Sequence, residues 1–292
     1  MKIGLFGKTF SDREIVYLQQ LIDKLQNVNC RLTVYEPFLK RIKDKVSLHC
    51  SPQTFNSYKE LKGKADILFS IGGDGTMLDT IAFVRDSGIP VLGINLGRLG
   101  FLSSISRNEI LPAIDKIVAG DYRLEQRALL KLKSPAGLFG ELNYALNELS
   151  ISKTDTNSLA VVSVHVNDKF LNTYWADGLL VATPTGSTAY SLSCYGPIIT
   201  PGSENFVITP IASHNLTVRP IVIPDNSVIR LTVGGRNSEY QVGLDSRYKT
   251  INNNIELIIE RADFKLNLIQ LPNKDFFSTI REKLLWGKDQ RN

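Results

Sequence analysis

The chain has 292 residues, of which 43% are hydrophobic and 22% charged, a composition typical of a folded soluble protein. No apolar run reaches the length of a membrane helix, and MKIGLFGKTF at the start lacks the apolar core of a secretory signal. The three cysteines are far apart and form no Cys-x-x-Cys pair, which disfavours a metal or redox motif and fits a cytoplasmic protein. The formal net charge of +5 suits an anionic ligand or simply a solvated basic surface, and no nucleic-acid-binding module or membrane segment is recognisable.

The first 120 residues alternate between strand-like and helix-like stretches. Strands are expected over 2–7, 30–38, 65–71 and 89–97, and helices over 76–88, after the Ser11-x-x-Glu14 capping box and after the Ser106-x-x-Glu109 capping box. Residues 65–71 are almost all apolar, as in a strand buried on both faces. This alternation predicts an α/β N-terminal domain with a parallel sheet flanked by helices.

Beyond residue 120 the pattern changes to a period of two. Val162, Val164 and Val166 alternate with polar residues, and Asn167-Asp168 is a plausible hairpin turn. Further strands are expected over 178–184, 227–235, 239–245, 253–261 and 264–271, and a helix over 275–286. We therefore expect a mostly antiparallel β C-terminal domain over 121–271, with a final helical segment over 272–292.

Three glycine-containing stretches are candidates for binding phosphate. Gly7-Lys8-Thr9 resembles the end of a Walker A loop but lacks the required upstream glycine, and 93–100 does not have the dinucleotide spacing. Gly72-Gly73-Asp74-Gly75 remains, at the end of an apolar strand. Its glycines and the helix start near Thr76 are predicted to hold phosphate through backbone N–H groups.

Asp74 would oppose a phosphate that merely lay beside it. Two functional readings stay open: Asp74 binds a metal that bridges phosphates, or it takes a proton from an attacking hydroxyl. The structural alternative is an ordinary turn or helix N-cap residue.

Two other stretches carry polar groups next to apolar strands. Residues 176–193, ADGLLVATPTGSTAYSLS, end in hydroxyl-rich sequence that suits ribose and adenine edges, with Tyr190 offering a ring face; a plain surface loop is the alternative. Asn147-Glu148 places an amide and a carboxylate between apolar stretches, either as ligand-binding groups or at an exposed strand end.

Taken together, these stretches resemble the NAD kinase family. The resemblance rests on the motifs at 72–76, 95–97, 100–102, 147–148, 177–178 and 183–193, and continues through 212–223, Leu244-Asp245 and 280–284. The GGDG turn alone is weak, since some lipid kinases and phosphofructokinases have similar turns, whereas TPTGSTAYSLS is highly specific. The motifs span nearly the whole chain in order.

The resemblance implies an enzyme that transfers the γ-phosphate of ATP to the 2′-hydroxyl of the adenosine ribose of NAD, making NADP. It also implies a β-sandwich-like C-terminal domain, a C-terminal helix that packs back on the N-terminal domain, a divalent cation such as Mg²⁺, and a homodimer or homotetramer. The alternatives are a lipid or sugar kinase with a GGDG turn, or a non-catalytic NAD(P)-binding sensor.

Residue roles follow by position. Asp74 is the implied catalytic base. The implied NAD-binding residues are Asp74, Gly75, Asn147, Glu148, Asp177, Thr188, Ala189, Tyr190, Ser191, Leu192, Ser193, Ala212 and Arg247, and those for ATP phosphate are Gly72, Gly73, Gly75 and Thr76. Asp245 lies beside the implied site. Trp175, Ser158 and Tyr195 depart from the family pattern, Tyr195 where a glycine is usual. Arg247 also replaces the smaller polar residue of some relatives.

Overall fold

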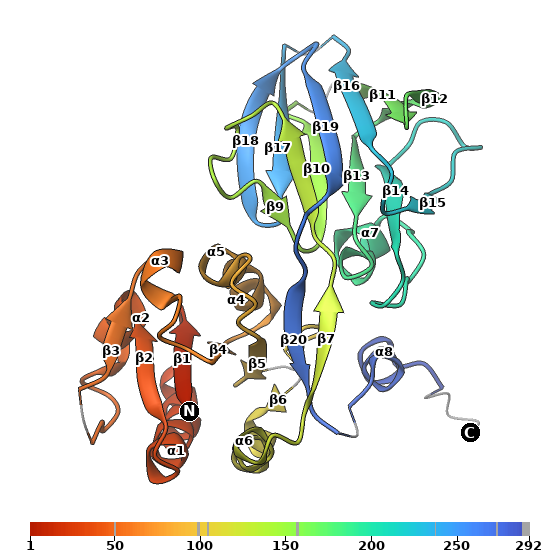
Figure 1. Cartoon of the computed structure of the whole chain (residues 1–292). Coiled ribbons are helices and arrows are strands. Elements are labelled where there is room, and N and C mark those ends of the chain that lie inside the picture. Colours follow the sequence, from red (N-terminus) through yellow and green to blue (C-terminus); the bar gives the residue numbers. More distant parts are fainter. Residues whose placement is uncertain are drawn as a thin grey trace. The chain divides into compact units, whose positions relative to one another are not determined.

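The structure is a computed structural model that describes residues 1–49, 51–97, 100–103, 105–155, 158–236, 238–272 and 274–287. It divides into two compact units, Met1–Gln126 with Leu266–Asn292, and Arg127–Lys265. The domain limits near 120 and 271 stay a sequence-based prediction. Strands β7 and β20, which lie on either side of the second unit in sequence, run side by side in the sheet of the first unit (Figure 1).

The first unit contains an eight-stranded sheet in the order β3-β2-β1-β4-β5-β20-β7, with β6 also paired to β5. Its strands are β1 (Lys2–Gly7), β2 (Arg31–Tyr35), β3 (Gln53–Phe55), β4 (Ile67–Ile71), β5 (Val91–Asn95), β6 (Ile105–Ser106), β7 (Arg123–Arg127) and β20 (Leu266–Gln270). Strands β1 to β5 pair in parallel, so their carboxyl ends meet at one edge, with Gly7 opposite Ile71. All five residues of β4 are buried, as its apolar sequence predicts.

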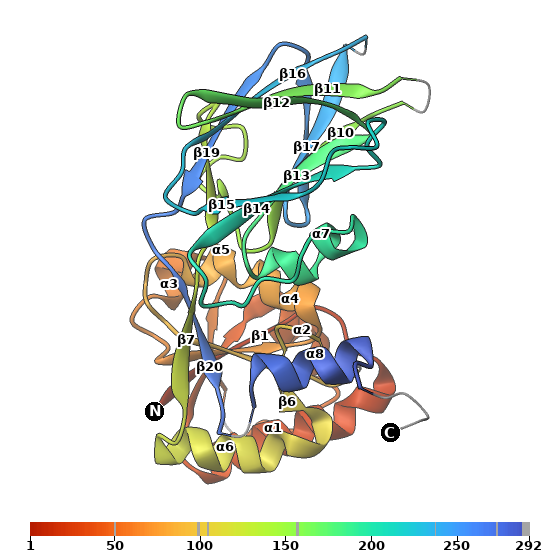
Figure 2. The same ribbon diagram turned by 90° about the vertical axis from the view of Figure 1, so that its right-hand side faces the viewer.

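Helices accompany this sheet, and α1 and α6 lie alongside each other (Figure 2). The helices of the first unit are α1 (Ile15–Asn27), α2 (Glu36–Ile42), α3 (Tyr58–Leu61), α4 (Asp74–Asp79), α5 (Ile81–Val84), α6 (Ile110–Ala119) and α8 (Phe276–Leu284). Both predicted capping boxes are present: the Ser11 N–H donates to Glu14 Oε2 (2.5 Å) and the Ser106 N–H to Glu109 Oε2 (3.0 Å). The expected α/β domain with a parallel sheet and flanking helices is confirmed.

Three local expectations need correction. The predicted strand 30–38 ends at Tyr35, because Pro37 lies in the first turn of α2, a position that favours helix. The predicted helix 76–88 is two short helices, α4 and α5. They meet at Thr80, whose hydroxyl donates to the Met77 carbonyl (2.6 Å), a bond that bends helices. The predicted strand 264–271 is present as β20, but it was expected in the antiparallel C-terminal domain. It instead pairs in parallel with β5 of the first unit.

The second unit has two six-stranded sheets, in the orders β15-β14-β13-β10-β17-β18 and β12-β11-β16-β19-β8-β9. Its elements are β8 (Leu130–Ser134), β9 (Tyr144–Ala145), β10 (Glu148–Lys153), β11 (Ala160–Val166), β12 (Lys169–Ala176), β13 (Gly178–Ala182), α7 (Tyr190–Ser193), β14 (Asn205–Ile211), β15 (Ile221–Pro224), β16 (Ile229–Gly234), β17 (Glu239–Leu244), β18 (Arg247–Asn252) and β19 (Glu256–Arg261). The strand pairs within each sheet are antiparallel.

Both sheets of the second unit contribute to one apolar core, in which Leu149 and Val181 of the first sheet join Val162 and Leu231 of the second. The period-two sequence pattern supplies this core, since alternate side chains of a strand point to the same face. The predicted hairpin at Asn167-Asp168 is also confirmed: both residues have positive φ (51° and 61°), which suits the tight turn between β11 and β12.

Two further sequence observations can be placed. Among the described helices, none is long and apolar enough to cross a membrane. Cys30 and Cys194 are free thiols. Cys50 lies outside the described residues, as do Arg98 and Leu99 of the glycine-rich stretch 93–100.

Candidate functional site

The Gly72–Gly75 turn follows directly from the carboxyl end of β4. Gly72 has a φ of +146°, and a Cβ there would lie 2.4 Å from the Thr76 hydroxyl oxygen, so this position requires glycine. Gly75 has open space around it, and the nearest atom to a Cβ at Gly73 is 3.9 Å away, on Asn95. Glycine is thus needed structurally at one position and leaves a free surface at the other two.

The backbone of this turn is partly committed to the protein itself. The Gly72 N–H donates to the Ile94 carbonyl (2.9 Å) and the Thr76 N–H to the Gly73 carbonyl (3.0 Å). Any phosphate contact by Thr76 therefore falls to its hydroxyl. Helix α4 has only six residues, so its dipole is a weaker anion attractant than the sequence suggested.

Asp74 begins α4, and its carboxylate is held by three consecutive backbone N–H groups. Phe101 donates to Oδ2 (2.7 Å), while Leu102 and Ser103 donate to Oδ1 (3.0 and 3.1 Å). A Cβ at Gly100 would lie 1.9 Å from Oδ1, so glycine lets the chain approach the carboxylate. A carboxylate has about four lone-pair positions, so these contacts fix its orientation and leave about one acceptor position open.

In the second unit, Asn147 and Glu148 lie where the chain enters β10. The Thr183 hydroxyl donates to the Leu146 carbonyl (2.5 Å), and the Thr183 N–H donates to the Asn147 carbonyl (2.8 Å). A Cβ at Gly186 would lie 2.1 Å from the Asn147 carbonyl oxygen. The TPTG stretch therefore packs directly on the Leu146-Asn147 backbone, and two motifs far apart in sequence form one structural element.

Glu148 has an unusual electrostatic environment. Its Oε2 atom is buried and finds no hydrogen-bond partner in the part of the chain that the structure describes. Burial raises the pKa of Glu148 from 4.5 to about 8, and the negative charge of Asp245 adds to the effect. Near neutral pH the side chain is therefore mostly a neutral acid, able to donate one hydrogen bond and accept another.

The hydroxyl-rich stretch uses several of its hydroxyls internally. Buried Ser187 donates to the Pro184 carbonyl (2.6 Å), and buried Ser191 shares a hydrogen bond with Thr209 (3.0 Å). The Thr188 hydroxyl donates to the carbonyl of Thr185 (3.1 Å). These residues shape the loop. The exposed members of the predicted set are Tyr190, 46% exposed at the start of α7, and Ser193 at its end.

Asp177 and Arg247 are both engaged within the second unit. Asp177 forms an ion pair with Lys153 (2.6 Å), a residue that sequence reasoning missed. The Arg247 guanidinium donates to the carbonyls of Leu142 and Tyr144. Ala212 is exposed, with a φ of +46°.

Besides Arg247, three departures from the family pattern can now be placed. Tyr195 has a φ of +63°, the left-handed region that favours glycine, and is 93% exposed. It keeps the backbone conformation that a glycine would adopt and adds a ring at the surface. Trp175 is 55% exposed on β12, and Ser158 is hydrogen-bonded to Asp155 (3.0 Å).

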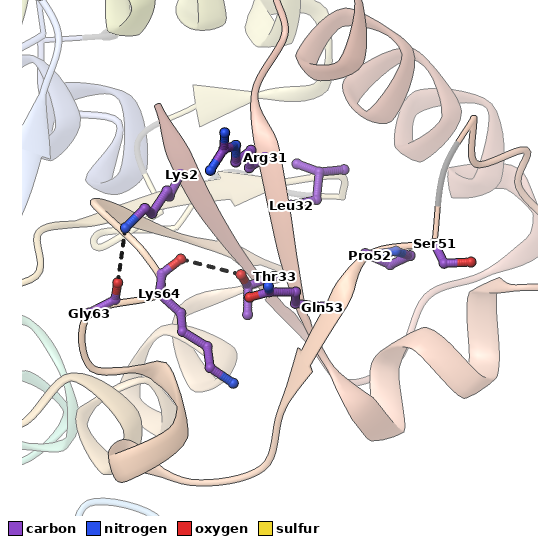
Figure 3. Close-up of a pocket in the computed structure, with 9 residues that line it drawn as sticks. All are labelled: Lys2, Arg31, Leu32, Thr33, Ser51, Pro52, Gln53, Gly63 and Lys64. Atoms are coloured by element: carbon purple, nitrogen blue, oxygen red, sulfur yellow. Dashed lines mark hydrogen bonds between the residues drawn. The ribbon is translucent and has the colours of Figure 1, made fainter.

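Two cavities differ in what lines them. One of about 610 Å³ in the second unit includes Tyr190, Ser193 and Ala212, so it brings together three predicted NAD-binding residues. One of about 380 Å³ in the first unit is lined by Lys2, Arg31 and Lys64, among others (Figure 3). It lies at the amino ends of β1 and β2, away from Asp74 at the carboxyl edge, and contains none of the predicted site residues.

The predicted residues fall into two sets, each described within its own unit: 72–76 in the first, and the remainder from Asn147 to Arg247 in the second. The groups that sequence reasoning missed are the backbone N–H groups of 101–103, the ion-pair partner Lys153 and the hydrogen bonds of Asp245. Backbone N–H groups carry no residue-type signal, although Gly100 within a Gly-Phe-Leu motif hinted at a close approach.

Comparison with known proteins agrees with these motifs. A model described as the ATP-NAD kinase N-terminal domain matches residues 3–122, and one described as the ATP-NAD kinase C-terminal domain matches residues 146–271. NAD kinases from Cytophaga hutchinsonii and Flavobacterium psychrophilum are 44% and 43% identical to the chain, each over the full length of both proteins.

Solved structures agree on the fold. Yeast NADH kinase complexed with NADH superposes with a TM-score of 0.87 at 24% identity, covering 99% of this chain and 89% of the yeast chain. An NAD kinase from Archaeoglobus fulgidus in complex with ATP gives a TM-score of 0.75 at 22% identity, covering 98% and 99%. With both halves of the chain matched and full-length relatives above 40% identity, the chain belongs to the NAD kinase family.

Proposed function

We propose that this member of the NAD kinase family transfers the γ-phosphate of ATP to the 2′-hydroxyl of the adenosine ribose of NAD. The observation that carries the proposal is the full-length match to NAD kinases at 44% identity, with both family domains present in order. The Asp74 turn and the Asn147-Glu148 segment are the parts of the chain with the chemistry that this reaction needs.

Asp74 is the proposed acceptor for the attacking hydroxyl. Three N–H groups hold its carboxylate, so its remaining acceptor position has a defined direction. In phosphoryl transfer the proton can leave late, and placing the nucleophile in line with the phosphate is a large part of catalysis. Asp74 therefore orients the 2′-hydroxyl and receives its proton as the new P–O bond forms.

The second unit supplies the proposed NAD contacts. Asn147 offers an amide, and Glu148 offers a buried carboxyl oxygen that has no hydrogen-bond partner among the described residues, which suits a ribose hydroxyl. Tyr190, Ser193 and Ala212 line a cavity of about 610 Å³, large enough for part of a dinucleotide. Gly73 and Gly75, with open space beside them, are the proposed phosphate contacts.

The divalent cation does not fit the described residues as a resident metal. They contain no group of three or more His, Cys, Asp or Glu side chains able to hold an ion. Three N–H groups leave the Asp74 carboxylate about one acceptor position, which the proposed reaction uses for the attacking hydroxyl. Since Mg²⁺ binds readily to nucleotide phosphates and keeps several waters, we propose that it arrives with ATP as part of the substrate.

One assay tests the function. Purified protein is incubated with ATP, Mg²⁺ and NAD, and NADP is measured with a strictly NADP-specific dehydrogenase. We expect NADP to form. NAD binding without product would instead indicate a sensor, and phosphorylation of a lipid or sugar without NADP would indicate another GGDG kinase. The homodimeric or homotetrameric state and the cytoplasmic location stay predictions, the first testable by light scattering.

A further inference from the structure

The turn between β17 and β18 carries a carboxylate that the proposed reaction does not use. Asp245 lies there with a φ of 53°, a conformation that Asp and Asn tolerate better than most residues. Its Oδ2 accepts the Leu146 N–H (2.9 Å), and its Oδ1 accepts those of Asn147 (2.8 Å) and Glu148 (3.3 Å). Three consecutive N–H groups of the proposed NAD-binding segment therefore point at one carboxylate.

The carbonyls of the same segment are also bonded. The Asp245 N–H donates to the Glu148 carbonyl (3.0 Å). The Thr183 hydroxyl donates to the Leu146 carbonyl, and the Thr183 N–H donates to the Asn147 carbonyl. Every backbone N–H and C=O of 146–148 thus has a partner in 183 or 245. A segment held at all six polar groups has little freedom, so the Asn147 and Glu148 side chains start from defined positions.

The same turn also holds the residues that precede this segment. Arg247 donates to the carbonyls of Leu142 and Tyr144, and its positive charge lies close enough to stabilise the ionised Asp245. A carboxylate and a guanidinium two residues apart therefore bind the N–H groups and the carbonyls of one strand entry.

We propose that Asp245 is the positioning residue of the NAD site, holding the amides of 146–148 so that Asn147 and Glu148 face the dinucleotide. This inference rests on the proposed function, because it presumes that these side chains bind NAD. Asp245 itself acts only through its neighbours.

Electrostatics adds a second consequence. Burial raises the pKa of Asp245 from 3.8 to about 6, so near neutral pH it is mostly ionised and able to accept all three bonds. Its charge in turn helps to raise the pKa of Glu148. The other titratable groups that sense Glu148 are Cys194 and Tyr190, both ordinarily neutral at this pH. Removing the charge at 245 should therefore lower the pKa of Glu148.

The variant Asp245→Asn tests both consequences. Asparagine suits the positive φ but has one acceptor oxygen and no charge. We expect the Kd for NAD to rise about tenfold or more, because a charge-assisted bond is lost and an N–H is left unpaired. The KM for ATP should change less than twofold. The midpoint of the pH profile of NAD binding should move below that of the wild type.

Asp225→Asn is the matched control. Asp225 is a buried carboxylate of the same unit whose side chain accepts a bond from Arg261 (2.8 Å), whereas the N–H groups of 146–148 donate to Asp245. This variant should lose stability while keeping the wild-type Kd for NAD and its pH midpoint. A wild-type Kd and midpoint in Asp245→Asn would overturn the proposal.

A measurement on the wild type decides the matter if Asp245→Asn does not fold. The amide resonances of Leu146, Asn147 and Glu148 should titrate together with a midpoint near pH 6, since protonation of Asp245 weakens all three bonds. Amide chemical shifts that do not change between pH 5 and 7.5 would contradict the proposed role of Asp245. If these amides titrate but the wild type binds no NAD, the proposed function fails while the structural role of Asp245 stands.

Discussion

Each unit contains a carboxylate that accepts hydrogen bonds from three consecutive backbone N–H groups. The two arrangements differ in which partner is the proposed functional group. In the first unit the amides of 101–103 hold Asp74, and Asp74 is the proposed reacting group. In the second unit Asp245 accepts hydrogen bonds from the backbone N–H groups of 146–148. There the proposed ligand-binding groups are the side chains of Asn147 and Glu148, not the carboxylate. The same hydrogen-bond pattern can thus orient a reacting carboxylate, as at Asp74, or the backbone that carries ligand-binding side chains, as at Asp245.

The largest effect is expected for Asp74→Asn. The amide cannot accept a proton from the 2′-hydroxyl, and its NH₂ group would face an N–H donor. We expect kcat to fall by about 10²–10⁴-fold, with the Kd for NAD within about threefold of the wild type. Steady-state kinetics and NAD titration measure the two quantities. A near-normal kcat would remove the proposed role of Asp74.

Gly100→Ala breaks the first arrangement without touching the carboxylate chemically. Its Cβ would lie 1.9 Å from the Asp74 Oδ1, so the carboxylate or the 100–103 segment must move. We expect kcat to fall about 100-fold, as for a misplaced catalytic group. Gly202→Ala, where a Cβ meets nothing within 4 Å, is the control and should retain wild-type kcat. Equal kcat in both alanine variants would show that the amides do not orient Asp74.

Asn147→Ala probes the side chain that the second arrangement presents. It leaves the backbone bonds to Asp245 and Thr183 in place, so we expect a folded protein whose NAD affinity falls about tenfold, the usual effect of losing one or two hydrogen bonds. Isothermal titration with NAD gives the value. An unchanged Kd for NAD would mean that the Asn147 side chain does not bind NAD and that Asp245 holds this segment only to stabilise the fold.

Glu148→Gln gives the smallest effect, a change in how stability depends on pH. Because the pKa of Glu148 is raised from 4.5 to about 8, the folded protein keeps a proton that the unfolded chain releases. Its contribution to the free energy of unfolding therefore falls as the pH rises through this window. Urea unfolding at pH 6.5 and 8 should show a decrease for the wild type that is smaller in Glu148→Gln. An equal decrease in the free energy of unfolding in both proteins would contradict the raised pKa of Glu148.

Most of the secondary structure was predictable from local pattern. The apolar run of β4, the two capping boxes and the hairpin at Asn167-Asp168 all formed where the sequence placed them. The failures were at positions where one residue outweighs periodicity, as Pro37 does at the start of α2 and Thr80 does between α4 and α5. The sheet that β20 joins was not predictable, because a strand's own residues do not specify a distant partner.

The candidate site divides in the same way. The sequence by itself determined the residue types that the chemistry needs, Asp74, Asn147 and Glu148, and the glycines without which the chain cannot approach them, because motif identity and backbone freedom are local properties. Only the tertiary structure decided what holds these residues in place. The donors to Asp74 lie 27 to 29 residues away, and the partners of Asp245 lie 97 to 99 residues away. They are backbone amides, which every residue except proline possesses, so no pattern of side chains can reveal them.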